Sequence, residues 1–172
     1  MTSPNKSPLG SGLRLAGSAP PVRLDHQFFE HESRPMLGAI LLKKGLVTPE
    51  RLDEALAEGK KTGMRLGEIL LTKGWLFEGE LAHALAEQFG IPYVDLAVNT
   101  VDPIAAGLLP LEVARRMFAV PVRFVGSDAI QVAVADPGDA DVEGLEQLLR
   151  HRVELAVGER SAIQVSWRSM QR

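Results

Sequence analysis

The sequence contains no cysteine, and this excludes every site that depends on a thiol. Disulfide bridges, thiolate metal ligands and a cysteine nucleophile are all ruled out. Long apolar runs are also missing, since no stretch approaches the roughly 20 residues that a membrane-spanning helix needs. The N-terminal MTSPNKSPLGSG lacks the apolar core of a signal peptide. The sequence therefore predicts a soluble, cytoplasmic protein without direct membrane insertion.

The chain also has little excess of positive charge. Its formal net charge is −3, whereas nucleic-acid-binding proteins usually present a basic face. Residues 48–57, T-P-E-R-L-D-E-A-L-A, look like part of a DNA-binding helix-turn-helix, but no basic recognition helix accompanies them. DNA binding is therefore the least favoured function, and we expect no nucleic-acid partner.

The motifs of common catalytic sites are absent as well. Residues 59–63 read G-K-K-T-G, but the upstream glycine and the spacing of a phosphate-binding loop are missing. The sequence has no G-x-S-x-G and no H-E-x-x-H. His26 and His31 specify no metal-ligand geometry. We therefore expect no enzyme activity, no catalytic residue and no metal site.

One segment, by contrast, occurs twice. Residues 36–59, MLGAILLKKGLVTPERLDEALAEG, align with residues 65–88, RLGEILLTKGWLFEGELAHALAEQ, at an offset of 65 − 36 = 29 residues. A period of this length indicates a duplicated supersecondary unit. Two copies are too few for a solenoid, so we predict a two-fold pseudo-repeat.

Each copy is predicted to form a short helix, a glycine stop and a longer helix. Apolar residues recur at helical spacing. Gly45 and Gly74 follow the first helix of each copy, where glycine readily adopts the left-handed conformation that ends a helix. Gly59 is interpreted as another helix stop, with residues 60–64 (KKTGM) as a spacer. Thr48 is the predicted N-cap of the longer helix in the first copy, and the second copy has no serine or threonine there.

After residue 90 the pattern changes to short helices and strands in the order α-β-β-α-β-α. The run Gly126–Asp128 separates two strand-like segments and indicates a hairpin. The sequence predicts helices over residues 102–109, 111–117, 142–149 and a last one capped by Ser161, with strands over 119–125, 130–135 and 153–157.

These patterns predict an α+β fold class. An N-terminal helical subdomain of two tandem helix-turn-helix repeats is followed by a small α+β subdomain with a three-stranded sheet. The predicted organisation is a disordered tail over residues 1–33, the duplicated helical subdomain over 34–90 and the small α+β subdomain over 91–172. Phe28 and Phe29 in the tail are either a docking pair or isolated aromatic residues.

The residues of the doubled segment resemble a known family. The pattern R-L-G-x-x-L-L-x-x-G, then L-x-x-x-L-x-x-Q, is followed by F-G-I-P-Y-V-D-L and I-x-V-A-V-A-D-P-x-D. Together they resemble the N-terminal domain of type II secretion ATPases and type IV pilus assembly ATPases, whose ligand-binding form is called MshEN. The resemblance covers residues 36 to about 168 and no ATPase region follows, so we expect a free-standing or truncated N-terminal domain.

The resemblance implies a non-enzymatic regulatory or adaptor module that binds protein components of a bacterial type II secretion or type IV pilus machinery. The alternative that it implies is a receptor for cyclic di-GMP, and we expect no other cofactor. Cyclic di-GMP is nearly two-fold symmetric, so a duplicated motif can present one copy to each half. An arginine offers a planar set of donors to phosphate or guanine, and a glutamine amide pairs through both a donor and an acceptor.

Only the second copy carries the complete set of residues that the resemblance implies for ligand binding. In the first copy, Met36 stands at the arginine position and Gly59 at the glutamine position. Arg34 is a candidate substitute for the arginine, but Pro35 follows it and directs the chain, and with it the arginine, differently toward the site. If each lost contact costs on the order of 1–3 kcal/mol, binding weakens by roughly two to four decades. The implied ligand-binding residues are Arg65, Leu66, Gly67, Leu81, Leu85 and Gln88 in the second copy, Leu37, Gly38, Leu52 and Leu56 in the first, and Asp136 in the A-D-P motif.

Purely structural roles stand beside these functional ones. Leucines in such a pattern more often form a hydrophobic core than a ligand-binding surface, and without a ligand Gln88 is better explained as a solvated helix end. Arg65 is equally compatible with a surface ion pair to Glu68. Arg115 and Arg116 form either a solvated helix face or a docking patch.

Overall fold

The computed structural model describes residues 36–171. The predicted tail, with Phe28 and Phe29, lies outside the described residues, as does Arg34. Within the described range, no helix is long and apolar enough to cross a membrane.

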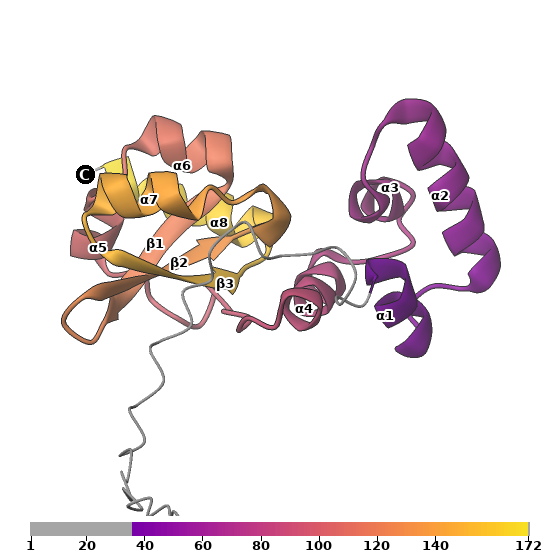
Figure 1. The fold of residues 1–172 in the computed structure, drawn as a ribbon, viewed down its shortest axis with the longest axis horizontal. Coiled ribbons are helices and arrows are strands. Elements are labelled where there is room, and N and C mark those ends of the chain that lie inside the picture. Colours follow the sequence, from indigo (N-terminus) through magenta and orange to yellow (C-terminus); the bar gives the residue numbers. More distant parts are fainter. Residues whose placement is uncertain (1–35, 172) are drawn as a thin grey trace, which may run out of the picture. The chain divides into compact units, whose positions relative to one another are not determined.

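The two copies of the repeat fold into two helix pairs (Figure 1). The first copy supplies α1 (Leu37–Lys43) and α2 (Pro49–Thr62), the second supplies α3 (Leu66–Thr72) and α4 (Glu78–Phe89), and the pairs that pack closely are α1 with α4 and α2 with α3. Gly45 and Gly74 both adopt positive φ, 67° and 68°, as the predicted helix stops require. The Thr48 side chain accepts a hydrogen bond from the Arg51 N–H at 3.3 Å and caps α2 as predicted.

The interpretation of Gly59 as a helix stop is wrong. Helix α2 continues through Gly59 to Thr62, and Gly63 is the residue that adopts the left-handed conformation, with φ 74°. A Cβ on Gly59 would lie 3.0 Å from the carbonyl oxygen of Met64. Glycine at position 59 therefore allows the chain after α2 to fold back closely over that helix, and most of the presumed spacer is helical.

Helix α4 has an N-terminal cap that does not depend on serine or threonine. The Phe77 N–H donates to the Glu80 carboxylate at 2.9 Å. This is the reciprocal half of a capping box, in which a glutamate in the first turn reaches back to the start of its helix.

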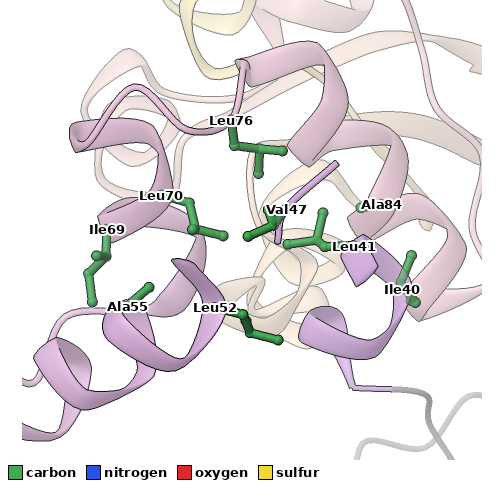
Figure 2. Close-up of a cluster of buried hydrophobic side chains, with 9 residues drawn as sticks. All are labelled: Ile40, Leu41, Val47, Leu52, Ala55, Ile69, Leu70, Leu76 and Ala84. Carbon is green, nitrogen blue, oxygen red and sulfur yellow. The ribbon is translucent and has the colours of Figure 1, made fainter. Parts of the chain in front are cut away.

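Equivalent positions of the two copies build one shared hydrophobic core (Figure 2). Four pairs of residues separated by 29 positions are buried in the same cluster, so each copy covers the apolar face of the other. The fold is thus pseudo-symmetric in its core as well as in its sequence. The pairs are Ile40 with Ile69, Leu41 with Leu70, Val47 with Leu76, and Ala55 with Ala84.

The glycine of each Leu-Gly pair lies against a leucine side chain from the second helix of its own repeat. A Cβ on Gly38 would lie 3.2 Å from a methyl carbon of Leu52, and one on Gly67 would lie 3.0 Å from a methyl carbon of Leu81. Any larger side chain would have to displace those leucines. Glycine at positions 38 and 67 therefore leaves room for these two leucine side chains.

The second part of the chain is an α+β unit with a mixed three-stranded sheet (Figure 1). The strand order is β1-β2-β3, with β1 antiparallel to β2 and β2 parallel to β3. The predicted fold class is confirmed. The elements are α5 (Pro103–Gly107), α6 (Leu111–Met117), β1 (Ala119–Val125), β2 (Ala129–Val134), the 3-10 turn η1 (Pro137–Asp139), α7 (Val142–Leu149), β3 (Arg152–Val157), α8 (Arg160–Ser166) and the 3-10 turn η2 (Trp167–Gln171).

Helices cover both faces of this sheet. On one face, alternate β2 residues such as Ile130 and Val132 pack in a cluster with Leu145 of α7. On the other face, Ala133 packs in a cluster with Ile163 of α8. The alternation follows from the two-residue period of a strand.

Ser161 does not cap α8 as predicted. The N-cap is Glu159, and Ser161 lies in the first turn of the helix. Its backbone N–H and its hydroxyl both donate to the carboxylate of Glu78, at 3.1 and 2.6 Å. Because Glu78 begins α4, this contact joins the start of the last helix to the second repeat.

Candidate functional site

A pocket of about 340 Å³ lies between the second repeat and the sheet edge. Strands β2 and β3 are parallel and end at the paired residues Val134 and Val157. The segments that follow them therefore meet at one edge, where open sheets commonly bind ligands. Residues of α3 and α4 form the opposite wall.

The structure brings together all six residues predicted in the second copy. Leu66, Leu81 and Leu85 form an apolar surface on that wall, which we call the leucine ledge. Arg65 lines the pocket from the N-cap of α3, and Gln88 lines it from near the end of α4. Leu37 reaches the pocket from the first copy, and Asp136 reaches it from the loop after β2. The predicted residues that line the pocket are Leu37, Arg65, Leu66, Gly67, Leu81, Leu85, Gln88 and Asp136.

Three residues predicted in the first copy are not part of the pocket wall. Leu52 is buried in the shared core, where only 7% of its surface is exposed. Leu56 is exposed, and Gly38 packs against Leu52. The pocket is consequently asymmetric, although the repeat that builds it is nearly symmetric.

Arg65 is the best-bonded cation of the pocket. Its guanidinium donates to the Asp136 carboxylate at 2.6 Å and also to the carboxylate of Asp139. Partial burial would lower the pKa of the guanidinium, but the two carboxylates outweigh burial and raise that pKa above its ordinary value. The expected pair with Glu68 is not formed, since the Glu68 carboxylate lies 4.0 Å from Arg160 instead.

The loop after β2 is shaped to hold these carboxylates. Asp136 accepts the Gly138 N–H at 2.8 Å with one oxygen and the Arg65 guanidinium with the other. A Cβ on Gly138 would lie 3.1 Å from Asp136 and 3.4 Å from the ring of Phe89. A larger residue at position 138 would therefore crowd the pocket at this point.

Apart from Asp136, sequence reasoning missed the part of the pocket that comes from the C-terminal half. Asp139, Glu159 and Arg160 all line it. The signal available in the sequence was their position just after two predicted strands. Only the knowledge that those strands run parallel would have placed Gly158–Arg160 beside the A-D-P loop.

Glu159 is positioned by a half-buried tyrosine. The Tyr93 hydroxyl donates to the Glu159 carboxylate at 3.1 Å, and the Tyr93 ring stacks on His83 at 3.9 Å between centroids. Burial, together with this carboxylate, raises the pKa of Tyr93 to about 12. The bond from Tyr93 thereby orients Glu159 at the pocket wall.

The pocket combines an apolar ledge with charges of both signs. Leucine side chains offer a flat apolar surface to an aromatic base, and carboxylates accept hydrogen bonds from guanine N–H groups. Arginine donors suit a phosphate or the acceptor edge of guanine. Among residues 36–171 no group of three or more potential metal-ligating side chains occurs. The pocket wall carries five carboxylates and two guanidinium groups, so it can bind a ligand that offers hydrogen-bond donors to the carboxylates and an acceptor or anionic group to the arginines.

Arg115 and Arg116 are both exposed on α6. Arg116 contributes to a second hollow, of about 520 Å³, which shares Asp136 and Asp139 of the loop after β2 with the first pocket. Arg160 lines both hollows.

Comparison of the sequence with known proteins shows which family this chain resembles. Residues 89–172 match the family model described as the MshEN domain. The chain is 33% identical over 128 residues to the type IV pilus assembly ATPase PilB of Myxococcus xanthus, and 44% identical over 114 residues to PilB of Thermus thermophilus. These matches cover 74% and 66% of this chain, but only 22% and 12% of the two relatives.

A solved structure of MshE with cdg, that is cyclic di-GMP, has a similar fold. Its TM-score is 0.68, and the sequences are 33% identical. The match covers 78% of this chain and 98% of that chain.

Proposed function

The chain belongs to the MshEN domain family of type IV pilus and type II secretion ATPases, and we propose that it is a regulatory module of such a machinery that binds cyclic di-GMP. The dinucleotide occupies the pocket of about 340 Å³ between the second repeat and the sheet edge. The module itself performs no chemistry. Its ligand instead changes how it engages protein components of the machinery.

One observation carries this proposal: the complete motif of the second repeat converges on a single pocket. Arg65 and Gln88 stand at two points of its wall, with the leucine ledge between them. A stretch of 24 residues that folded merely as core would not need to expose its arginine and its glutamine to one cavity. The similarity to MshE, whose solved structure contains cyclic di-GMP, supports the same assignment.

The first repeat contributes less to this ligand than the second. Met36 is 76% exposed and does not line the pocket, and Gly59 is enclosed by the turn after α2. A site that lacks one arginine and one glutamine contact loses roughly two to four decades of affinity relative to a fully equipped one. We therefore expect binding that is specific but weak.

Calorimetric titration of the whole chain with cyclic di-GMP tests the proposal. We expect saturable heat from the wild type and none from Arg65→Ala, because that variant removes the phosphate- or guanine-binding fork. Arg123→Ala is the matched control, since Arg123 is an exposed arginine on β1 that lines neither hollow. Met36→Arg restores the missing cation of the first copy next to Leu37, which does line the pocket, and the long side chain is expected to tighten binding about tenfold. Absence of heat at high protein concentration from both the wild type and Met36→Arg would refute ligand binding.

A second candidate function is a protein adaptor that works without the dinucleotide. It is favoured by the incomplete first copy and by the carboxylates that already neutralise Arg65. In that case purified pilus or secretion components bind the chain equally well with and without cyclic di-GMP. A capture experiment in which none of these components is retained would argue against an adaptor.

A further inference from the structure

The pocket contains a second cation that no part of the repeated motif supplies. Among the described lining residues, Arg65 and Arg160 are the two that carry positive charge. Arg65 is the N-cap of α3, and Arg160 is the first residue of α8. They therefore belong to opposite halves of the fold and face one pocket.

Arg160 is held by stacking rather than by strong hydrogen bonds. Its guanidinium lies over the ring of Phe118, 3.7 Å from the centroid. Its ion-pair contact among residues 36–171 is with Glu68, at 4.0 Å, the outer limit for such a pair. A guanidinium stacked on an aromatic face keeps its N–H donors in its own plane, where a ligand can reach them.

The aromatic platform beneath Arg160 is itself fixed. Phe118 ends α6 in the left-handed conformation, with φ 45°, which is uncommon for a residue other than glycine. Its ring packs against Trp167 at 5.4 Å between centroids, and the Trp167 indole N–H donates to the Ala119 carbonyl at 3.0 Å. Phe118 lines the neighbouring hollow, so its ring and Trp167 support Arg160 at the boundary between the two hollows.

We propose that Arg160 contacts the ligand and takes the place of the arginine that the first repeat lacks. This inference rests on the proposed function, because its ligand is the same cyclic dinucleotide. Such a ligand carries two phosphodiester charges, and the first copy offers Met36 where the second offers Arg65. Arg160 supplies the second positive charge from the C-terminal half, so the ligand bridges the two halves of the fold.

Glu68 competes with the ligand for Arg160. The carboxylate lines the same pocket and lies within ion-pair distance of the guanidinium. Removing its charge should therefore strengthen binding, whereas removing Arg160 should weaken it. These opposite directions separate a ligand contact from a general effect on folding.

The test is calorimetric titration of the whole chain with cyclic di-GMP at several salt concentrations. We expect Arg160→Ala to raise Kd at least about tenfold and to reduce its salt dependence, with Arg160→Lys in between. Glu68→Gln is expected to lower Kd about threefold. Arg116→Ala serves as the matched control, because Arg116 lines only the neighbouring hollow.

The outcomes separate this inference from the function on which it rests. If the wild type binds, and Arg160→Ala and Glu68→Gln both bind within twofold of it, Arg160 has no ligand contact and the proposed function stands. If neither the wild type nor Glu68→Gln binds at any salt concentration, both the contact of Arg160 with the ligand and the proposed function are overturned. Equal thermal unfolding midpoints for the wild type and Arg160→Ala would exclude loss of folded protein as the cause of weaker binding.

Discussion

The guanidinium of Arg65 is bonded to the carboxylate of Asp136, 71 residues further along the chain, at 2.6 Å. This bond joins the R-L-G motif of the second repeat to the A-D-P motif that follows β2. It therefore lies where the two halves of the fold meet at the pocket. Any anionic ligand that binds Arg65 has to share this cation with Asp136 and Asp139 or displace them.

The first prediction concerns the second of those carboxylates. Asp139→Asn leaves Arg65 with one charged partner, so we expect cyclic di-GMP to bind about three- to tenfold more tightly. The cost to folding is at most about 1 kcal/mol, because Arg65 and Asp139 are 50% and 60% exposed and such pairs are screened by solvent. Calorimetry measures the first effect and chemical denaturation the second.

Asp128→Asn provides the control for this prediction. It makes the same change of charge in the hairpin turn, where Asp128 lies 3.6 Å from Arg152. The control should bind the ligand as the wild type does. Weaker binding by Asp139→Asn would mean that the Asp139 carboxylate contacts the ligand directly rather than competing with it.

The elements that could be predicted from the sequence are those whose causes are local. Thr48 followed by Pro49 starts a helix by capping and by a fixed φ, and Gly45 ends one by adopting positive φ. Gly45 and Gly59 were both predicted to end a helix because they are glycines, and only Gly45 does so. A glycine ends a helix only when its backbone turns left-handed, and at position 59 it instead permits close contact with Met64.

The candidate site divides in the same way. The residues of the second repeat that line the pocket could be predicted because they belong to one continuous motif with a recognisable period. The wall that carries Asp139 and Arg160 depends on the parallel pairing of β2 with β3. Strand pairing is a long-range choice that periodicity does not encode, so these residues could not be assigned to the pocket from the sequence.

The second prediction tests the shared core of the two repeats. Leu41 and Leu70 are equivalent positions, and both are fully buried in one cluster. We expect Leu41→Ala and Leu70→Ala each to lower the free energy of unfolding by about 2–5 kcal/mol. Both variants should keep a single unfolding transition, because each repeat buries the apolar face of the other.

Leu56→Ala is the control for the core variants. Leu56 is 43% exposed, and its truncation should cost no more than about 1 kcal/mol. If Leu70→Ala instead produced two separate transitions in circular dichroism, the repeats would be independent units and the shared core would carry little energy.

The third prediction concerns Gly59 in the interior of α2. Alanine favours a helix by about 1 kcal/mol over glycine, but its Cβ would lie 3.0 Å from the Met64 carbonyl oxygen, and overpacking costs about 1–3 kcal/mol. We expect Gly59→Ala to be destabilising on balance. Gly107→Ala in α5 is the matched control, since nothing lies within 4 Å of the added Cβ, and it should be neutral or slightly stabilising. Equal stabilisation of both variants in urea denaturation would contradict the close contact at Gly59.

The fourth prediction concerns the titration of Tyr93, the single tyrosine of the sequence. Burial, followed by the bond to Glu159, raises its pKa from 10.0 to about 12. Between these two values the folded chain keeps a proton that the unfolded chain has lost. The contribution of Tyr93 to stability is therefore complete below about pH 10 and disappears as the pH rises through about 12.

Ultraviolet absorbance of the phenolate reports this one group, because no other tyrosine is present. We expect a midpoint near 12 in the folded chain and near the ordinary value of 10.0 in denaturant. Glu159→Gln removes the carboxylate that contributes to the raised pKa of Tyr93 but leaves the tyrosine buried. The titration midpoint of Tyr93 in this variant should therefore be lower than in the wild type but still higher than in the denatured chain. A midpoint that already matches the denatured chain in the wild type would place Tyr93 in solvent, and the orientation of Glu159 at the pocket wall would lose its support.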